Sequence, residues 1–257
     1  MTNRHGEFIW YELMTTDVEA ARAFYEPVVG WKIGAASAMP GTDYRMIAGS
    51  DGAEIAGALA LDEEMRAGGA RPVWVGYIAV DDVDATAQAI PAMGGQVHVP
   101  PQDIPGVGRF AMASDPHGAP FYVMRGTVEG GSSTAFSVDG IGHCGWNELS
   151  SPDQKTALQF YTGLFGWTNP ESMPMGEMGD YHFLCVDDLR IGASMEDKSH
   201  PAHWRHYFRV PSVGVATRAI EAGQGQVLHG PHEVPGGDII IIAVDPQGAQ
   251  FALVGGH

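Results

Sequence analysis

The chain has 257 residues, a net charge of −17 and a sequence pI of about 4.8. Its hydrophobic fraction of 44% can fill one large core or two ordinary ones, while the acidic surface repels phosphate backbones and excludes nucleic acid as the expected partner. No apolar run is long enough to span a bilayer, and the first residues show no signal-peptide core, so we expect a cytoplasmic protein without a membrane partner.

The first predicted element is a strand over Phe8–Met14, because polar and apolar residues alternate there and aromatic side chains are frequent. A helix is predicted to start near Asp17 and to end at Gly30. Its apolar residues recur at helical spacing and share one face, and they are Ala20, Ala21, Phe24, Tyr25 and Val28.

The next stretch of chain follows the same order. Val73–Val80 is predicted as a strand and Val83–Met93 as a helix rich in alanine. Two further strands, Arg109–Ala113 and Phe121–Met124, flank the sequence Asp-Pro-His-Gly at 115–118. Asp-Pro-x-Gly is typical of a tight turn, because Asp bonds the backbone, Pro restricts φ and Gly accepts positive φ.

The second half of the chain repeats the first. Trp10 matches Trp146, an offset of 136 residues, and the pairs Phe24/Phe160 and Gly30/Gly166 share that offset. Tyr44 matches Tyr181, and beyond a deletion the offset becomes 130, as in Trp74/Trp204. So many matches in the same order indicate a tandem duplication. In the second copy, Ser151-Pro152-Asp153-Gln154 predicts a helix with Ser151 as its N-cap.

We therefore expect two domains, 1–126 and 141–257, joined by a Gly/Ser-rich linker at 127–140. Each domain divides again into two units of strand, helix and strands. These four modules cover about residues 7–61, 72–125, 141–197 and 203–254. The sequence leaves open whether modules pair within one half or across the two halves. The only cysteines, Cys144 and Cys185, are expected to be free buried thiols.

The strand–Asp–helix–"FY"–"GW" pattern and the closing D-P-x-G-x-x-F resemble the vicinal oxygen chelate superfamily, which includes glyoxalase I, bleomycin resistance proteins and extradiol dioxygenases. The resemblance covers about residues 7–125 and 141–254. It implies an α+β fold of four βαβββ modules, paired into two glyoxalase-like domains whose curved mixed sheets enclose clefts. Many members bind a divalent metal in the cleft.

The same resemblance implies where metal ligands would stand. The matching positions are Trp10, Val75, Tyr122, Trp146, Arg205 and Ala252. None of them is His, Asp or Glu, and indole or aliphatic groups offer no donor to a divalent cation. We therefore expect no metal and no other cofactor at these positions.

Strand alternation then selects the side chains that line the clefts. The candidate ligand-binding residues are Trp10, Glu12, Met14, Tyr77, Tyr122, Trp146, Glu148, Arg205 and Tyr207. This lining is largely aromatic and apolar with few charges, as in many small-molecule pockets. The two tryptophans either fill core space or form stacking platforms for a planar or cationic ligand.

The two glutamates are unusual in this setting, because a buried carboxylate is costly unless it is paired or functional. In the second copy, Glu148 is expected to form an ion pair with Arg205 or Arg209. In the first copy, Glu12 is the candidate catalytic base. His203 and His206 lie three apart on a predicted strand and so point to opposite faces, which argues against a shared metal ion.

Three hypotheses follow. The first is a metal-independent binding protein for a small, partly aromatic molecule, as in the bleomycin resistance branch. The second is a lyase, isomerase or related enzyme that acts on a small carbonyl compound, with Glu12 as base or with a metal at other ligands. The third is a protein-association module with filled clefts. The chain is expected to be a monomer or a homodimer, and the sequence leaves open whether it is an enzyme.

Overall fold

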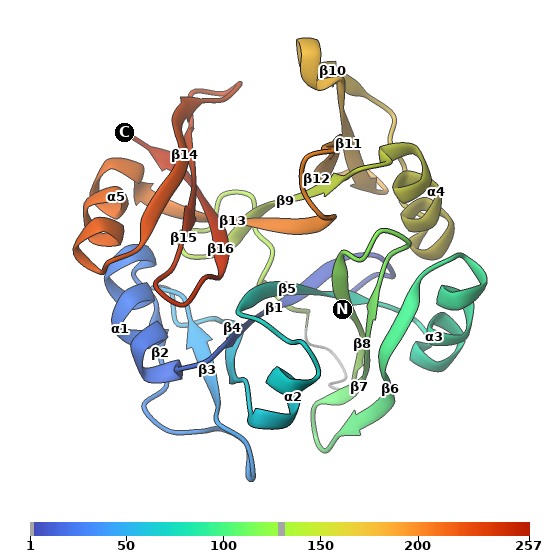
Figure 1. The fold of residues 1–257 in the computed structure, drawn as a ribbon, viewed down its shortest axis with the longest axis horizontal. Helices are drawn as coiled ribbons and strands as arrows, with labels where there is room; N and C mark the ends of the chain where they lie inside the picture. The colour runs from blue at the N-terminus through green and yellow to red at the C-terminus, as the bar shows by residue number, and fades with distance from the viewer. Residues whose placement is uncertain (1–2, 128–131) are drawn as a thin grey trace. The chain divides into compact units, whose positions relative to one another are not determined.

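The computed structural model describes residues 3–127 and 132–257 (Figure 1). The first half contains β1 (Phe8–Thr15), α1 (Val18–Val29), β2 (Lys32–Ile33), β3 (Tyr44–Ala48), β4 (Glu54–Ala60), α2 (Glu63–Ala67), β5 (Val73–Ala79), α3 (Val83–Ala92), β6 (Gln96–Ile104), β7 (Gly108–Ser114) and β8 (Pro120–Gly126). The second half contains β9 (Cys144–Ser151), α4 (Gln154–Phe165), β10 (Ser172–Pro174), the 3₁₀-helix η1 (Gly176–Met178), β11 (Asp180–Val186), β12 (Leu189–Glu196), β13 (His203–Ser212), α5 (Val213–Ala222), β14 (Gln226–Glu233), β15 (Ile239–Val244) and β16 (Gln250–Gly256).

These elements confirm the expected α+β fold of βαβββ modules. The strands belong to two mixed sheets of eight strands each, β1 to β8 in one and β9 to β16 in the other. In every module the first strand runs parallel to the last, as β1 does with β4 and β9 with β12. The remaining neighbours within a module are antiparallel, for example β3 with β4 and β15 with β16. The helix supplies the crossover that a parallel pair requires.

Helix ends follow from local side chains. Asp17 caps α1, since its carboxylate accepts a hydrogen bond from the Ala20 amide at 2.9 Å. The predicted N-cap Ser151 is wrong: Asp153 caps α4 and accepts from the Thr156 amide at 3.1 Å. The Asp carboxylate lies three residues before that free amide, which is the reach that capping needs. Gly30 ends α1 as expected, with φ of 85°.

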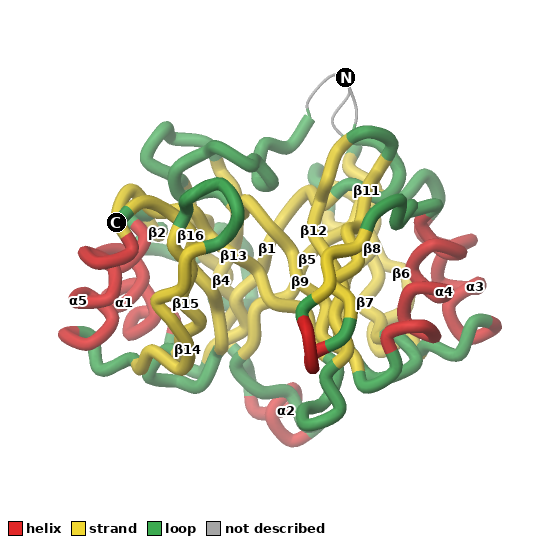
Figure 2. Tube along the Cα trace, turned by 90° about the horizontal axis from the view of Figure 1, so that it is seen from above, coloured by secondary structure: helices red, strands yellow, loops and turns green. Residues whose placement is uncertain are grey.

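The modules combine across the two halves of the sequence. One compact unit, here called the first–fourth unit, contains residues 10–75, 134–145 and 206–257. The other, the second–third unit, contains residues 3–9, 76–127, 132–133 and 146–205 among the described residues. Within the former, α1 and α5 lie side by side, and within the latter α3 and α4 do so (Figures 1 and 2). The structure thus answers a question that the sequence leaves open.

A buried hydrogen-bond chain joins the modules inside each unit. In the first–fourth unit, the Trp74 indole donates to the Tyr25 hydroxyl at 3.0 Å, and this hydroxyl donates to the Asp245 carboxylate at 3.0 Å. In the second–third unit, the Trp204 indole donates to Tyr161 at 2.8 Å, and Tyr161 is hydrogen-bonded to Asp115. The repeated "FY" and D-P-x-G motifs therefore meet in space, and they specify how modules pair.

Large aromatic side chains fill the space around each of these chains. In the first–fourth unit, the cluster consists of Tyr25, Trp31, Trp74, Phe208 and Phe251. In the second–third unit, it consists of Phe121, Phe160, Tyr161, Phe165, Trp167 and Trp204. Such rings bury large apolar areas and add favourable edge-to-face contacts, so each unit has a core of its own.

Three smaller expectations can be compared with the structure. Both cysteines are free and buried, as predicted. Part of the expected linker, residues 128–131, lies outside the described residues, and within its remainder Phe136 forms a parallel bridge with Cys144. In the described part of the chain, no helix has the length and hydropathy to cross a membrane.

Candidate functional site

The opening strand of each half carries the residues on which the sequence argument centres. On β1, alternation brings Trp10, Glu12 and Met14 to one face, and on β9 it does the same for Trp146 and Glu148. Both tryptophans are only half-buried. Both carboxylates are largely covered, with exposed fractions of 3% for Glu12 and 7% for Glu148. A covered carboxylate next to a partly open indole is the first feature of the candidate site.

In the first–fourth unit, Tyr44 on β3 completes the arrangement. The Trp10 indole donates to the Tyr44 hydroxyl at 2.9 Å, and this hydroxyl is hydrogen-bonded in turn to Glu12. Burial, and then the negative charge of Glu12, raise the pKa of Tyr44 well above its usual value. The tyrosine therefore stays protonated and holds both partners in fixed positions.

A glycine makes room for this tyrosine. Gly57 is the β4 residue that lies opposite Glu12 in the strand register. A β-carbon on Gly57 would come within 2.0 Å of the Tyr44 hydroxyl oxygen. Any other residue at this position would displace the tyrosine from the tryptophan and the glutamate, because a side chain cannot overlap another. Gly57 of β4 thus leaves space for the Tyr44 side chain and adds no side chain of its own.

The second–third unit contains the same chain with an added cation. Trp146 donates to Tyr181 at 2.9 Å, and Tyr181 donates to one Glu148 oxygen at 2.9 Å. The other Glu148 oxygen accepts from Arg205 at 2.5 Å. Arg205 also contacts His203 at 2.9 Å, and burial lowers the pKa of that histidine. The expected ion pair of Glu148 is therefore with Arg205.

The alternative partner, Arg209, is used elsewhere. Its guanidinium pairs with Asp238 at 2.7 Å and donates to the Val138 carbonyl. Within the described residues, the Nε atom of Arg205 is buried and has no hydrogen-bond partner. A buried donor of this kind is normally satisfied, so it is a group to which a bound molecule could offer an oxygen.

The remaining candidates lie in both units. Tyr77 and Tyr122 belong to the second–third unit, where their rings stack with centroids 4.1 Å apart and an angle of 11°. Tyr207 belongs to the first–fourth unit, is almost fully buried, and pairs in register with Ala252. Met14, in the same unit, is also buried. Of the predicted residues, Trp10 is joined to Glu12 through Tyr44, and Trp146 and Arg205 are joined to Glu148, the former through Tyr181.

The two tyrosines Tyr44 and Tyr181 were not among the site residues predicted from sequence. Their match in the repeat was visible, but each is separated from its glutamate by more than thirty residues. Only the pairing of β3 with β4, and of β4 with β1, brings Tyr44 to Glu12. The match of Tyr44 with Tyr181 in the repeat was the one sequence signal for these two site residues.

The donor set does not fit a divalent cation at the positions implied by the resemblance. In the described part of the chain, no three of its His, Cys, Asp and Glu side chains gather where they could hold a metal ion. At the two first-strand positions stand the indoles of Trp10 and Trp146, whose nitrogen donates a hydrogen bond and cannot coordinate. What these residues can do is stack, donate and accept hydrogen bonds.

Comparison with known proteins agrees with this fold. A family model described as the Glyoxalase/Bleomycin resistance protein/Dioxygenase superfamily matches residues 8–123 and 140–253. Among solved structures, the Mn(II)-bound glyoxalase from Novosphingobium aromaticivorans superposes with a TM-score of 0.66 at 19% identity. This superposition covers 98% of this chain and 82% of that one. At such an identity the likeness concerns the fold alone.

Two relatives are closer in sequence. The protein CFP32 from Mycobacterium tuberculosis (strain CDC 1551 / Oshkosh), provisionally named a glyoxylase, is 33% identical over 253 residues, which cover 98% of this chain and 95% of the relative. The anthracycline biosynthesis protein DnrV from Streptomyces peucetius is 30% identical over 271 residues, which cover 97% and 93%. Both matches extend over nearly the whole of each chain.

Proposed function

This chain belongs to the Glyoxalase/Bleomycin resistance protein/Dioxygenase superfamily, and from that premise we propose that it binds a small, partly aromatic molecule without a divalent metal. The observation that carries the proposal is the repeated chain of tryptophan, tyrosine and glutamate. Trp10, Tyr44 and Glu12 form it in one unit, and their counterparts form it in the other. The tryptophan of each chain stands at the first-strand position from which relatives of this type are expected to hold a metal.

The indole is suited to stacking in this arrangement. A hydrogen bond from its nitrogen to the tyrosine restrains the ring plane, so that little rotamer freedom is lost when a ligand binds. Trp10 and Trp146 are half-buried, so neither residue is closed off from solvent. Offset stacking and cation–π contacts favour a planar ligand, with a positive group near the glutamate as an added preference.

The relatives support the same class of ligand. DnrV is named for the biosynthesis of anthracyclines, which are fused-ring aromatic compounds, and it matches this chain over nearly its full length. The two units differ in one respect that bears on selectivity. Arg205 neutralises Glu148 and keeps one buried donor, whereas the equivalent residue of the first half is Val75. The unit containing Arg205 is therefore suited to a ligand with a hydroxyl, carbonyl or carboxylate oxygen.

An enzymatic role for Glu12 is the second candidate. It is supported by the almost complete burial of this carboxylate and by the name of CFP32 as a provisional glyoxylase. The hydrogen bond from Tyr44 stabilises the ionised carboxylate, which is the form that accepts a proton from a carbon acid. In this case Glu12 is the base, and Tyr44 is the group that holds it in place.

Ligand fluorescence tests the binding proposal on the full chain. We expect doxorubicin, a water-soluble fluorescent anthracycline, to show saturable binding in the presence of EDTA. Trp10→Ala and Trp146→Ala should each weaken binding at one of the two sites by about tenfold, because stacking is lost. Leu228→Ala, at an exposed apolar residue of β14, is the control for non-specific adhesion and should bind as the wild type does.

Two results would contradict the proposal. One is binding that needs added Mn²⁺ or Mg²⁺, since recognition would then depend on a metal. The other is equal affinity in the wild type and in both tryptophan variants. Glu12→Gln separates the two candidate functions: a binding role predicts weaker affinity, whereas a catalytic role predicts retained affinity with loss of turnover on a carbonyl substrate. Unchanged binding and turnover in Glu12→Gln would show that Glu12 takes part in neither function.

A further inference from the structure

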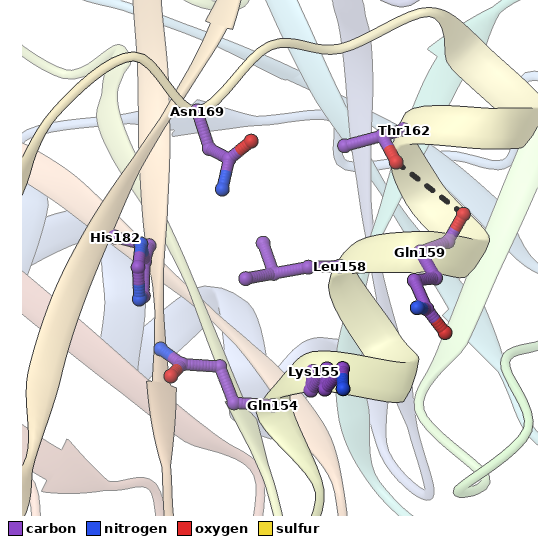
Figure 3. A pocket seen from close by; sticks show the side chains of 7 residues that line it. All are labelled: Gln154, Lys155, Leu158, Gln159, Thr162, Asn169 and His182. Carbon is purple, nitrogen blue, oxygen red and sulfur yellow. Dashed lines mark hydrogen bonds between the residues drawn. The ribbon is translucent and has the colours of Figure 1, made fainter.

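The third module contains a pocket away from the tryptophan and glutamate chain. It has a volume of about 330 Å³ and lies between α4 and the strand β11 (Figure 3). Its lining residues are Gln154, Lys155, Leu158, Gln159, Thr162, Asn169 and His182. In Figure 3, Leu158 extends from the helix toward the middle of the pocket, with His182 and Asn169 on the opposite side.

This pocket is on the other face of the sheet from the candidate site. Tyr181, which binds Glu148, and His182 are neighbours on β11, and adjacent strand residues point to opposite faces. The helix α4 covers the face to which His182 points. Gln154 secures the helix there, because its amide nitrogen donates to the Asp180 carbonyl at 2.9 Å and to the Ser194 carbonyl at 2.6 Å. The wall of the pocket is thus anchored to two strands.

The first module provides an internal comparison, because ion pairs occupy the equivalent space between its helix α1 and its strand β3. Arg45 on β3 pairs with Glu19 on α1 at 2.5 Å and with Asp43 at 2.9 Å. Arg22 pairs with Glu19 at 3.0 Å and with Glu26 at 3.3 Å. Arg45 bridges the strand and the helix through Glu19 and is only 12% exposed, while Arg22 extends the network along α1.

The repeat shows how the bridge was lost. At the offset of 136, Glu19 becomes Lys155, Arg22 becomes Leu158 and Glu26 becomes Thr162, and at the offset of the Tyr44/Tyr181 pair Arg45 becomes His182. The two arginines and the two glutamates of the network are all replaced, and three of the four replacements are shorter. The pocket therefore occupies the volume that the ion pairs fill in the first module.

The exchange also changes the charge. The five network residues of the first module, with two arginines and three carboxylates, sum to −1, whereas the pocket lining contains Lys155 and no carboxylate. A positive lining is notable in a chain of net charge −17. Asn169 and Gln159 add neutral hydrogen-bond donors and His182 adds an imidazole, whereas the Thr162 hydroxyl donates to the Gln159 backbone carbonyl at 3.3 Å (Figure 3). This set suits an anionic group more than a cation.

We propose that this pocket binds a small molecule that carries a carboxylate or phosphate group. Lys155 supplies the charge, the neutral side chains supply hydrogen bonds, and Leu158 contacts the carbon part of the ligand. The volume is at the lower end of the range for small-molecule sites, so the ligand is a small metabolite rather than a cofactor of nucleotide size. The proposal does not depend on the aromatic ligand proposed above.

Amide chemical shifts of the full chain test this site. Inorganic phosphate and succinate are titrated separately at constant ionic strength, so that the two sources of negative charge are distinguished. We expect saturable shifts at the backbone amides of α4 and at the side-chain amide of Asn169. Lys155→Ala should weaken binding at least about fivefold, in keeping with one charge-assisted hydrogen bond. Lys32→Ala, which removes an exposed lysine of the first module, is the matched control and should bind normally.

A second variant rebuilds the network of the first module. Lys155→Glu/Leu158→Arg/Thr162→Glu/His182→Arg should fill the pocket with ion pairs and abolish the shifts. Should this variant fail to fold, Lys155→Ala still decides the matter. The proposal is overturned if neither anion gives saturable shifts, or if Lys155→Ala binds as the wild type does. Doxorubicin affinity should be unchanged in Lys155→Ala, so failure here is distinct from failure of the proposed function.

Discussion

At the residue scale, single substitutions between the copies decide what each site can bind. Trp10, Glu12 and Tyr44 are matched by Trp146, Glu148 and Tyr181, so the same hydrogen-bond chain exists twice. The exchange of Val75 for Arg205 then adds a guanidinium beside Glu148. An arginine next to a buried glutamate offsets the cost of burying that charge.

A buried histidine makes the protein sensitive to acid. Burial lowers the pKa of His206 to about 3, and its ring packs edge-on against Tyr11 with centroids 4.9 Å apart. The unfolded chain binds a proton here near pH 6.5, whereas the folded chain does not. Stability from this residue is therefore complete above about pH 6.5 and is lost as pH falls toward 3, by up to about 1.4 kcal/mol per pH unit.

His206→Phe keeps an aromatic ring against Tyr11 but cannot be protonated. We expect urea unfolding at pH 7.5 and pH 5 to show a loss for the wild type that exceeds the loss for this variant by about 2 kcal/mol. Other titrating groups contribute equally to both proteins. The exposed His232→Phe should keep the wild-type pH dependence. Identical pH slopes for wild type and His206→Phe would refute this explanation.

At the element scale, the Asp-Pro-x-Gly turns do more than reverse the chain. Asp245 accepts the amides of Gln247 and Ala249 with one carboxylate oxygen, and with the other it accepts the hydroxyl of Tyr25. Burial raises the pKa of this tyrosine well above its usual value, so that it remains a donor. The turn of the fourth module is thus attached to the helix of the first.

Removing one hydroxyl tests the importance of this link. Tyr25→Phe leaves the Trp74 indole nitrogen and one Asp245 oxygen buried without that partner, which should cost about 2 kcal/mol. Tyr161→Phe should have a similar effect in the other unit. Thermal unfolding is the measurement, and Trp74→Phe alone and combined with Tyr25→Phe forms the double-mutant cycle. Fully additive effects in this cycle would show that the chain of hydrogen bonds is not a coupled unit.

At the scale of the whole molecule, the modules that form a compact unit are not the two that make up one half of the sequence. The first module forms a compact unit with the fourth, and the second with the third. Gln247 shows the connection in detail, because its side chain accepts the Asp17 amide at 2.7 Å and donates to the Asp17 carbonyl at 2.8 Å. Gln247, from the fourth module, thus bonds the backbone at the N-terminus of helix α1 in the first module.

Separating the two halves should therefore destabilise both. We expect residues 1–131 and 132–257, produced apart, to be largely unfolded or self-associated. Each half then lacks the modules that form compact units with its own two modules. Mixing the halves should restore native circular dichroism and a single complex in size-exclusion chromatography. Two monomeric halves that each unfold at the wild-type temperature would contradict the pairing of modules across the sequence.

Much of the secondary structure was predictable, since local patterns specify it. The strand predicted over Phe8–Met14 is β1, and the helix predicted over Val83–Met93 is α3. The N-cap at Ser151 was wrong because two capping residues, Ser151 and Asp153, stand close together and only geometry shows which one reaches the helix amides. The contribution of Tyr44 could not be predicted, because it depends on the order of strands in the sheet.

By itself, the sequence determined the duplication, the four modules, the α+β class and the family, because each rests on spacing and pattern within short stretches of chain. Tertiary structure alone decided which modules form compact units, which tyrosine meets which glutamate, and where a pocket replaces an ion-pair network. These properties depend on contacts between residues far apart in sequence. Such contacts are set by side-chain volume and hydrogen-bond geometry, which a linear pattern does not contain.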